Sequence, residues 1–402
     1  MKETILITSN TYLPNIGGIE NSLKYLAESY ARLGYDVIIL VSDLSSLGDK
    51  LNKVEHLNNI TIYRYPTFSN MKGILKPLRF FRSNYSAYKI FRSIKNHNKI
   101  VLTLSRFHIT TVIAKLAQMP YLTYLVPGVV KNQNTRVNIA NTFGLKRLTS
   151  DLSTVVHHLI QKFALKHCDT VLVFSQNMAK QIANICPKRS NVPILKPGVD
   201  IEQFKPALDK MSLRIEHKIP TNKIILLTVG RFVRAKGFDL VIDAMTRLPE
   251  CHLLMVGDGE NATEIKDQIN QQNLTSHITL VGAKNNTIPY YQLSDIFIMS
   301  SRYEPLGQTI IEALATGLPI IAFKGNGILT ATEELLSDKE AIFTSKINGD
   351  GIANCVSTLT HNPSLMAELA VSGREIAKAN FSWSELATQI LEYRVDAPPY
   401  SP

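Results

Sequence analysis

The sequence is poor in cysteine and contains no long hydrophobic run. Its four cysteines are far apart and form no pair with metal-binding spacing: Cys168, Cys186, Cys251 and Cys355. We therefore expect reduced thiols that fill the core, and a cytoplasmic location. No run of 18 or more apolar residues occurs, so no transmembrane helix is expected. The start, Met1–Ile5, includes an acid before a short apolar run, which indicates a first strand rather than a secretion signal.

Acidic residues are scarce in the first half of the chain. Positions 56–150 contain no Asp or Glu, although they carry 15 Lys and Arg. Residues 1–199 have a net charge of +17, whereas residues 200–402 have −6. This asymmetry indicates a polyanionic partner surface, which could be anionic lipid, a phosphate-bearing acceptor or nucleic acid. Because no DNA- or RNA-binding signature is present and the second half is acidic, nucleic acid is not the expected partner.

Short apolar segments alternate twice with amphipathic stretches, which predicts two α/β domains with parallel sheets. The strands expected in the first half are 4–8, 36–41, 60–63, 100–104, 121–125, 170–174 and 192–195. Those expected in the second half are 224–229, 252–256, 278–281, 295–299 and 319–323. A chain of 402 residues is also too long for one ordinary core and fits two domains of about 200 residues.

Pro197-Gly198 and Pro206 interrupt regular secondary structure, so we place the domain boundary in this region. We expect a first doubly wound, Rossmann-like domain over 1–197 and a second over 198–380. A C-terminal helix and tail over 381–402 is expected to pack back on the first domain. Doubly wound sheets bind ligands outside the carboxyl ends of their strands, so the site is expected in a cleft between the two domains.

A glycine pair, Gly17-Gly18, stands between the first predicted strand and the first predicted helix. Glycines let a backbone approach a ligand closely, and a helix start offers free N–H groups to an anion. The alternative is a tight strand-to-helix turn, since a glycine pair by itself is a weak signal.

A basic loop, 230–237 with the sequence GRFVRAKG, follows the strand predicted at 224–229. It places Arg231 and Lys236 at the mouth of the second domain. A fork-shaped guanidinium and a compact ammonium suit a diphosphate. A solvated basic loop is the alternative, but cations clustered in an otherwise acidic domain favour a binding role.

Two glutamates, Glu304 and Glu312, frame the start of a predicted helix that begins near Gly307. They are about 12 Å apart if all eight residues are helical, so they could accept hydrogen bonds from hydroxyls at the two ends of an extended ligand. Backbone N–H groups of 307–309 could hold its phosphates. The alternatives are a helix-terminus charge for Glu304 and an exposed helix position for Glu312, although the apolar residues that flank Glu312 disfavour exposure.

The stretch Ser294–Ala322 resembles the signature of the retaining glycosyltransferases of the glycogen synthase-like, bacterial mannosyltransferase-like group, glycosyltransferase family 4. Further similarities follow in the family's order: NTYLPNIGGIE near the start, VLVFS at 171–175, KPGVD at 196–200, GRFVRAKG, LLMVGDGE at 253–260 and FSW at 381–383. The resemblance implies the GT-B fold, in which two Rossmann-like domains face each other across a cleft. It also implies sugar transfer from a nucleotide-diphosphate sugar, with retention at the anomeric carbon.

In that family the residues matching Arg231 and Lys236 bind the donor diphosphate. The glutamate matching Glu312 holds the ribose hydroxyls, and the one matching Glu304 contacts the donor sugar near the reacting carbon. The resemblance thus implies Glu304 as the catalytic residue of this chain.

The remaining donor contacts implied by the resemblance come from backbone. Backbone matching Gly307, Gln308 and Thr309 meets the phosphates, and backbone near Lys284 meets the base. The Gly17-Gly18 loop closes over the donor. Neither a metal ion nor another cofactor is expected, because cationic side chains and helix ends offset the charge of the leaving diphosphate.

One departure concerns the first domain. Many relatives carry a histidine after the strand predicted at 121–125, where this chain has Leu125-Val126-Pro127-Gly128. His108 is the nearest candidate to replace it, and a helix-start histidine without a chemical role is the favoured alternative. The catalytic contribution of the first domain therefore stays open.

Basic residues alternate with aromatic ones over 72–99. A basic amphipathic helix of this kind can lie on an anionic membrane with its aromatics in the interface. We expect peripheral association with the inner face of the cell membrane and an anionic, polysaccharide or lipid-linked acceptor, as in surface polysaccharide or glycolipid synthesis. A solvated basic face with core aromatics is the alternative.

Two other functions remain to be weighed against a glycosyltransferase. A sugar-nucleotide epimerase can share the two-domain architecture, but it converts its donor without an acceptor, and the glutamate pair and the basic loop favour a transferase. A non-catalytic binding protein for polyanions or nucleic acid would not need these motifs. The sequence names neither the sugar, the nucleotide, the acceptor nor the oligomeric state.

Overall fold

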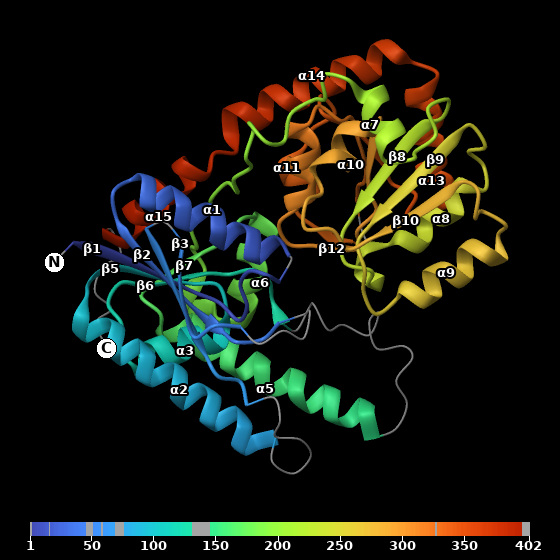
Figure 1. Ribbon diagram of the computed structural model, residues 1–402. Coiled ribbons are helices and arrows are strands. Elements are labelled where there is room, and N and C mark those ends of the chain that lie inside the picture. Colours follow the sequence, from blue (N-terminus) through green and yellow to red (C-terminus); the bar gives the residue numbers. More distant parts are fainter. Residues whose placement is uncertain are drawn as a thin grey trace. The chain divides into compact units, whose positions relative to one another are not determined.

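The computed structural model describes residues 2–15, 17–45, 51–57, 59–68, 76–130, 145–325 and 328–395. The described residues form two compact units, which are coloured along the sequence in Figure 1. The first unit contains the described residues up to Leu195 together with the segment from Trp383 onward. The second contains Lys196–Ser382.

The described part of the first unit contains a seven-stranded sheet of order β3-β4-β2-β1-β5-β6-β7. Its strands are β1 (Glu3–Thr8), β2 (Asp36–Ser42), β3 (Val54–Leu57), β4 (Ile60–Tyr65), β5 (Lys99–Ser105), β6 (Leu122–Leu125) and β7 (Thr170–Leu172). Neighbours are parallel, with Ile5 opposite Val37 on one side and Leu102 on the other, except for the antiparallel edge pair β3–β4. Strand order reverses between β1 and β5, which is the topological switch point of this sheet.

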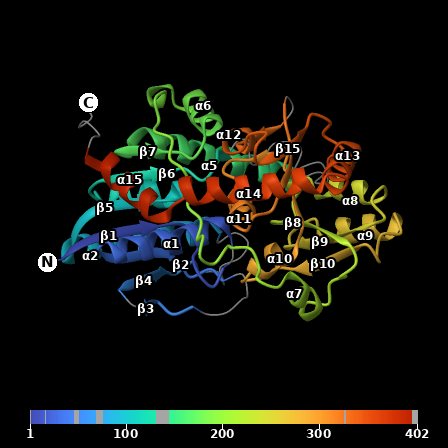
Figure 2. The ribbon, with the colours of Figure 1, turned by 90° about the horizontal axis from the view of Figure 1, so that it is seen from above.

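Helices cover both faces of this sheet. They are α1 (Gly18–Arg32), α2 (Lys76–His97), α3 (His108–Leu116), α5 (Leu145–His167), α6 (Gln176–Ile185) and α15 (Trp383–Val395), with a short 3₁₀ turn η2 (Pro187–Arg189). Leu23, Leu26, Ala27 and Tyr30 are buried at the spacing of one helical face of α1. The helix α15 lies beside α1 (Figures 1 and 2), and the rings of Tyr25 and Trp383 stack with centroids 5.3 Å apart.

The described part of the second unit contains a six-stranded parallel sheet of order β10-β9-β8-β11-β13-β15, with a small β12–β14 pair beside it. Its strands are β8 (Ile224–Val229), β9 (Cys251–Val256), β10 (Ile278–Gly282), β11 (Ile296–Met299), β12 (Tyr303–Glu304), β13 (Ile320–Phe323), β14 (Leu329–Thr330) and β15 (Ala341–Thr344). The switch point of this sheet lies between β8 and β11.

Alternate residues along the strands of the second unit belong to two separate hydrophobic cores. Leu226 and Leu253 belong to one core with α8 (Phe238–Met245), α9 (Ala262–Gln271) and α13 (Gly349–Thr360). Ile225 and Leu254 belong to the other, with α10 (Ile288–Leu293), α11 (Gln308–Ala315) and α14 (Pro363–Asn380). The remaining helices are α7 (Lys210–Glu216), α12 (Thr332–Leu335) and the 3₁₀ turn η3 (Arg234–Lys236). Continuously apolar strands buried on both faces are the sequence pattern of such a parallel sheet.

The prediction of two doubly wound α/β domains is confirmed, and most predicted strands agree with the structure to within a residue or two. One predicted strand is wrong. Residues 192–195 contribute a single β-bridge between Val173 and Ile194, because Pro193 has no N–H to continue a ladder. The strands β3, β12, β14 and β15 were not predicted. No helix among the residues described here is long and apolar enough to cross a lipid bilayer.

Candidate active site

The candidate site of the second unit lies where its strands end. Arg231 and Lys236 follow β8, Lys284 follows β10, and Glu304 and Gly307 follow β11. Because β8 and β11 flank the switch point, the loops after them border the place where an open α/β sheet binds its ligands. The sequence analysis placed these residues at strand ends, and the structure locates them there.

The loop after β8 is held tightly against the loop after β11. Gly237 has a φ of 65°, and a Cβ at this position would lie 2.1 Å from the carbonyl oxygen of Ser300. The Ser300 hydroxyl donates to the carbonyl of Lys236 at 2.7 Å, and the Arg302 N–H donates to the carbonyl of Ala235 at 2.8 Å. Only glycine combines this conformation with this close approach. The position of Lys236 is therefore fixed by backbone contacts.

The side chain of Arg302 also holds the loop after β8 in place. Its guanidinium makes two hydrogen bonds to the Asp239 carboxylate, at 2.8 and 2.7 Å, and a third to the carbonyl of Arg234 at 3.0 Å. Bidentate arginine–carboxylate pairs are among the most geometrically specific side-chain contacts. This pair was not predicted, because nothing in the sequence indicates that residues 63 positions apart are paired.

Lys236 and Glu304 form an ion pair whose Nζ and Oε2 atoms are 2.5 Å apart. Glu304 is 6% exposed, and its carboxylate also accepts hydrogen bonds from the N–H of Gly307 at 3.2 Å and from the hydroxyl of Ser301 at 3.4 Å. The helix-terminus contact weighed for Glu304 is thus present, through Gly307, together with the ion pair. These contacts give the carboxylate one orientation beside the start of α11.

The first turn of α11 presents unused hydrogen-bonding groups. Gly307, with a φ of 84°, precedes the helix and provides no side-chain cap. The N–H groups of Gln308 and Thr309 are in the first helical positions, where no intrahelical acceptor exists. The Gln308 Oε1 and Thr309 Oγ1 atoms are buried and have no partner among the described residues. A helix start with free donors, where the macrodipole favours negative charge, is suited to phosphate oxygens.

Glu312 lies one turn further along α11 and is 7% exposed. The alternative of an exposed helix position is therefore wrong. Its carboxylate accepts a hydrogen bond of 2.8 Å from the Tyr291 hydroxyl. Burial raises the pKa of Glu312 to about 7, although hydrogen bonds from Tyr291 and Gln308 act to lower it. With a pKa of about 7, the carboxyl group is partly ionised near neutral pH, and in its ionised form it can accept hydrogen bonds from ligand hydroxyls.

Arg231 and Lys284 have exposed side chains. Neither side chain has an ion-pair or hydrogen-bond partner within the described ranges, so both cations are free to meet a ligand. Across the part of the chain that the structure describes, no group of three His, Cys, Asp or Glu side chains is arranged to hold a metal ion.

The predicted residues of the first unit lie at the corresponding edge of its own sheet. Gly17 precedes α1 and Gly18 begins it. His108 begins α3 directly after the loop that follows β5, and its Nε2 is 2.8 Å from Nδ1 of His157. Burial, together with His157, lowers the pKa of His108 to about 3. The imidazole is therefore neutral near pH 7, with His157 as its hydrogen-bond partner. That His108 replaces the family histidine stays a prediction.

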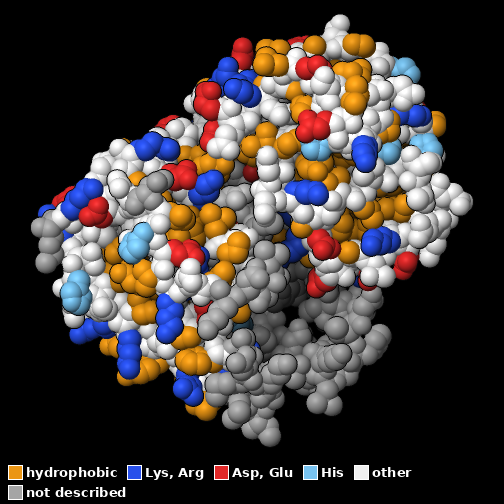
Figure 3. All heavy atoms as spheres, in the orientation of Figure 1, with side chains coloured by type: hydrophobic (Ala, Val, Ile, Leu, Met, Phe, Trp, Pro, Cys, Tyr) orange, Lys and Arg blue, Asp and Glu red, His pale blue; other side chains and the backbone are white. Residues whose placement is uncertain are grey.

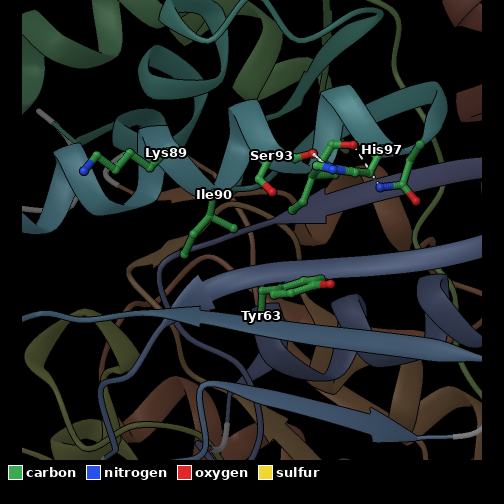
Figure 4. A pocket seen from close by; sticks show the side chains of 7 residues that line it. Tyr63, Lys89, Ile90, Ser93 and His97 are labelled. Atoms are coloured by element: carbon green, nitrogen blue, oxygen red, sulfur yellow. Dashed lines mark hydrogen bonds between the residues drawn. The ribbon is translucent and has the colours of Figure 1, made fainter.

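A hollow of roughly 370 Å³ lies between α2 and β4 in the first unit. Figure 4 shows Ile90 and Ser93 of the helix lying over the ring of Tyr63 on the strand. The hollow also includes His97 and Asn98, which immediately precede β5. It lies along the face of the sheet beside α2, and none of the predicted site residues lines it.

Solved structures with the same architecture are known. Sucrose-phosphate synthase from Thermosynechococcus elongatus superposes with a TM-score of 0.79 at 21% identity, over 98% of each chain. Anabaena HepE in complex with UDP and glucose superposes with a TM-score of 0.76 at 16% identity, over 98% of this chain and 99% of that one. The fold is the GT-B fold of the two-domain glycosyltransferases.

Two family models together match most of the chain. The model described as Glycosyltransferase Family 4 matches residues 16–203, and the one described as Glycosyl transferases group 1 matches residues 209–376. The chain belongs to this family of glycosyltransferases.

Curated relatives match this chain over different lengths. The mannosylfructose-phosphate synthase of Agrobacterium fabrum is 27% identical over 59% of this chain, and an uncharacterized glycosyltransferase of Methanocaldococcus jannaschii is 24% identical over 98% of it. The match spans 54% of the Agrobacterium enzyme and 97% of the archaeal protein. A lipopolysaccharide core glycosyltransferase of Rhizobium meliloti is matched over 52% of its length. The chain thus spans about half the length of two of these relatives.

Proposed function

We propose that this protein transfers a sugar from a nucleotide-diphosphate sugar to an acceptor, with retention of the anomeric configuration and without a metal ion. The observation that supports this most directly is the 2.5 Å pair of Lys236 and Glu304 beside the uncapped start of α11. It places a fixed ammonium, a fixed carboxylate and free backbone donors at one sheet edge. That combination suits a diphosphate linked to a sugar.

The donor diphosphate is bound in this proposal by Lys236, Arg231 and the first turn of α11. As the bond between sugar and diphosphate breaks, negative charge grows on the diphosphate. Fixed donors that face this charge stabilise the transition state more than the ground state, which lowers the barrier. The tight packing of Gly237 on Ser300 is what keeps Lys236 in place for this task.

Glu312 binds the ribose hydroxyls of the donor. Its buried carboxylate already accepts hydrogen bonds from Tyr291 and Gln308, and because an ionised carboxylate has about four acceptor sites, capacity remains for two neighbouring hydroxyls. Glu304, oriented by Lys236 and Gly307, contacts the donor sugar near the reacting carbon. Retention and this division of roles rest on the family resemblance.

The names of several relatives support a nucleotide-sugar donor and a lipid-linked acceptor. HepE has been solved with UDP-glucose. One relative is an Escherichia coli enzyme named as a galactosyltransferase that uses UDP-Gal and a diphosphoundecaprenol-linked sugar. Another is a GDP-mannose-dependent phosphatidylinositol monomannoside mannosyltransferase of Mycolicibacterium smegmatis. We therefore propose a role in surface polysaccharide or glycolipid synthesis.

Peripheral membrane association through α2 forms part of this proposal. Phe91 and Ile94 face the core, whereas Phe81 and Tyr85 are 69% and 59% exposed. Some aromatics of the basic stretch thus belong to the core, as the alternative expected, and others are exposed, which supports the proposal of a membrane contact. Figure 3 shows basic side chains interleaved with hydrophobic ones over the region that α2 occupies in Figure 1. Each Lys or Arg near an anionic leaflet contributes roughly 1 kcal/mol to binding.

Vesicle sedimentation tests this association. We expect stronger binding to anionic than to neutral vesicles, and a loss of binding in Phe81→Ser. Val371→Ser removes a 60% exposed apolar side chain from α14 and is the matched control. Equal binding to both kinds of vesicle would contradict the membrane proposal and would leave the donor site unaffected.

Thermal unfolding with UDP, GDP, ADP and TDP and their sugar conjugates, in the absence of metal, tests the donor site. A ligand at 100 times its dissociation constant adds about 2.7 kcal/mol to the unfolding free energy. We expect one nucleotide to raise the melting temperature of the wild type and to have a smaller effect on Arg231→Ala. No shift with any nucleotide would contradict the proposal.

A further inference from the structure

A buried arginine lies at the switch point of the first unit. Arg106 directly follows β5, and its backbone N–H donates to the carbonyl of Thr8, the last residue of β1, at 2.8 Å. Strand order reverses between these two strands. The residue therefore occupies the position where a doubly wound sheet places its ligand-binding groups. Arg106 is not among the residues predicted from the sequence to form the site.

The side chain of Arg106 lacks the partners that a buried charge requires. The residue is 2% exposed, and its Nε and Nη1 atoms are enclosed without a hydrogen-bond partner among the described residues. The guanidinium lies over the ring of Phe174, with its carbon 5.3 Å from the ring centroid. Burial lowers the pKa of Arg106 to about 10, so the group stays charged near pH 7. An unpaired buried cation of this kind destabilises the folded protein.

Among the described acids, Glu20 is the one whose charge acts on Arg106, and it does not form an ion pair with it. The Glu20 carboxylate acts on Arg106 at longer range, and it accepts a 2.6 Å hydrogen bond from the Thr11 hydroxyl. Positions 56–150 around Arg106 in the sequence contain no acid. The described surroundings of Arg106 thus supply an aromatic face and a distant charge, but no counter-ion.

We propose that Arg106 binds an oxyanion, a phosphate or a carboxylate, carried by the acceptor. The identification of this ligand as the acceptor rests on the proposed transferase function. Two unpartnered guanidinium nitrogens, at the switch point of a strongly basic unit, are donors that an oxyanion would satisfy. The bound oxyanion supplies the missing counter-ion and accepts hydrogen bonds from the guanidinium.

The sign of the stability change separates this role from a structural one. An arginine kept for packing is expected to destabilise the protein when it is removed. An arginine kept for a ligand is unpaired in the free protein, so Arg106→Met, which keeps most of its bulk, leaves the melting temperature unchanged or raises it. We expect this result for the free protein.

The test is a titration of inorganic phosphate at constant ionic strength, followed by thermal unfolding. The nucleoside diphosphate that binds the second unit is present at saturation, so that Lys236 and Arg231 are occupied. We expect phosphate to raise the melting temperature of the wild type further and to have no such effect on Arg106→Met. A parallel titration with acetate shows whether the site takes phosphate, a carboxylate or both.

Acceptor kinetics supply a second readout. Arg106→Met and Arg106→Lys are expected to raise KM for an anionic acceptor by about ten- to hundredfold, with nucleotide binding unchanged, because Lys lacks the guanidinium fork. A phosphate response that is equal in wild type and Arg106→Met, or a lower melting temperature of that variant without ligand, would overturn the inference. If the nucleotide itself does not bind, the proposed function fails instead.

Discussion

The ionisation of Glu312 gives a quantitative test of the donor site. In the empty site, burial holds the pKa of Glu312 at about 7, well above its ordinary value near 4.5. The ribose hydroxyls are donors and bind the carboxylate better than the protonated acid. Binding of the donor should therefore release a proton near neutral pH, and affinity should rise with pH.

The expected magnitude follows from the pKa. About a tenth of a group with a pKa of about 7 is ionised at pH 6, and about nine tenths at pH 8. If only the carboxylate binds, the dissociation constant of the nucleotide sugar falls about tenfold between these pH values. Glu312→Gln cannot ionise, so its affinity should be weaker and nearly independent of pH.

Isothermal titration calorimetry in two buffers of different ionisation enthalpy measures both affinity and proton release. The nucleotide sugar is a better ligand here than the free nucleoside diphosphate, whose terminal phosphate itself titrates near pH 6. Tyr291 stays protonated in this pH range, because burial and Glu312 raise its pKa well above its ordinary value of 10. Affinity that is constant from pH 6 to 8, or the same pH dependence in Glu312→Gln, would refute the assignment.

Four further predictions concern separate parts of the molecule. Glu304→Gln should lower the transfer rate by at least about a hundredfold while nucleotide affinity changes little, and normal turnover would contradict the role of this residue. Gly237→Ala forces a Cβ against the Ser300 carbonyl and should cost about 1–3 kcal/mol in unfolding free energy, measured by denaturant titration, with weaker nucleotide binding. The pKa of His108 is lowered to about 3 in the folded protein, below its unfolded value of 6.5, so stability is present above pH 6.5 and should fall by up to about 1.4 kcal/mol per pH unit below it. The unfolding free energy should depend less on pH below 6.5 in His108→Leu, which lacks the hydrogen bond to His157. An unchanged pH dependence in this variant would contradict the lowered pKa of His108. Chelation with EDTA should leave transfer unchanged, whereas loss of activity that added metal restores would show a metal requirement.

Much of the fold could be predicted because local pattern determines it. Apolar strands that alternate with amphipathic helices define a doubly wound sheet, and Ile224–Val229 agrees with the structure at both ends. The short strand β3 was missed because its residues are mostly exposed and show no apolar run. Residues 192–195 were wrongly predicted as a strand because apolar content alone does not reveal that a proline interrupts the ladder.

Candidate site residues could be named from the sequence, but the contacts between them could not. Lys236 and Glu304 were both singled out, yet their pairing depends on how two loops pack at the sheet edge. The hydrogen bond from Tyr291 to Glu312 joins two helices, and no motif spacing indicates it. Arg106 was overlooked because an arginine at the end of a strand looks like a solvent-exposed one until its burial is known.

Transfer itself is the most direct test of the central claim. The protein is incubated with membranes or lipid-linked acceptors and the radiolabelled nucleotide sugar that stabilises it, and label in the acceptor fraction is counted. The account predicts acceptor-dependent labelling in the wild type and none in Glu304→Gln. Conversion of the nucleotide sugar without any acceptor, or equal labelling by both proteins, would contradict it.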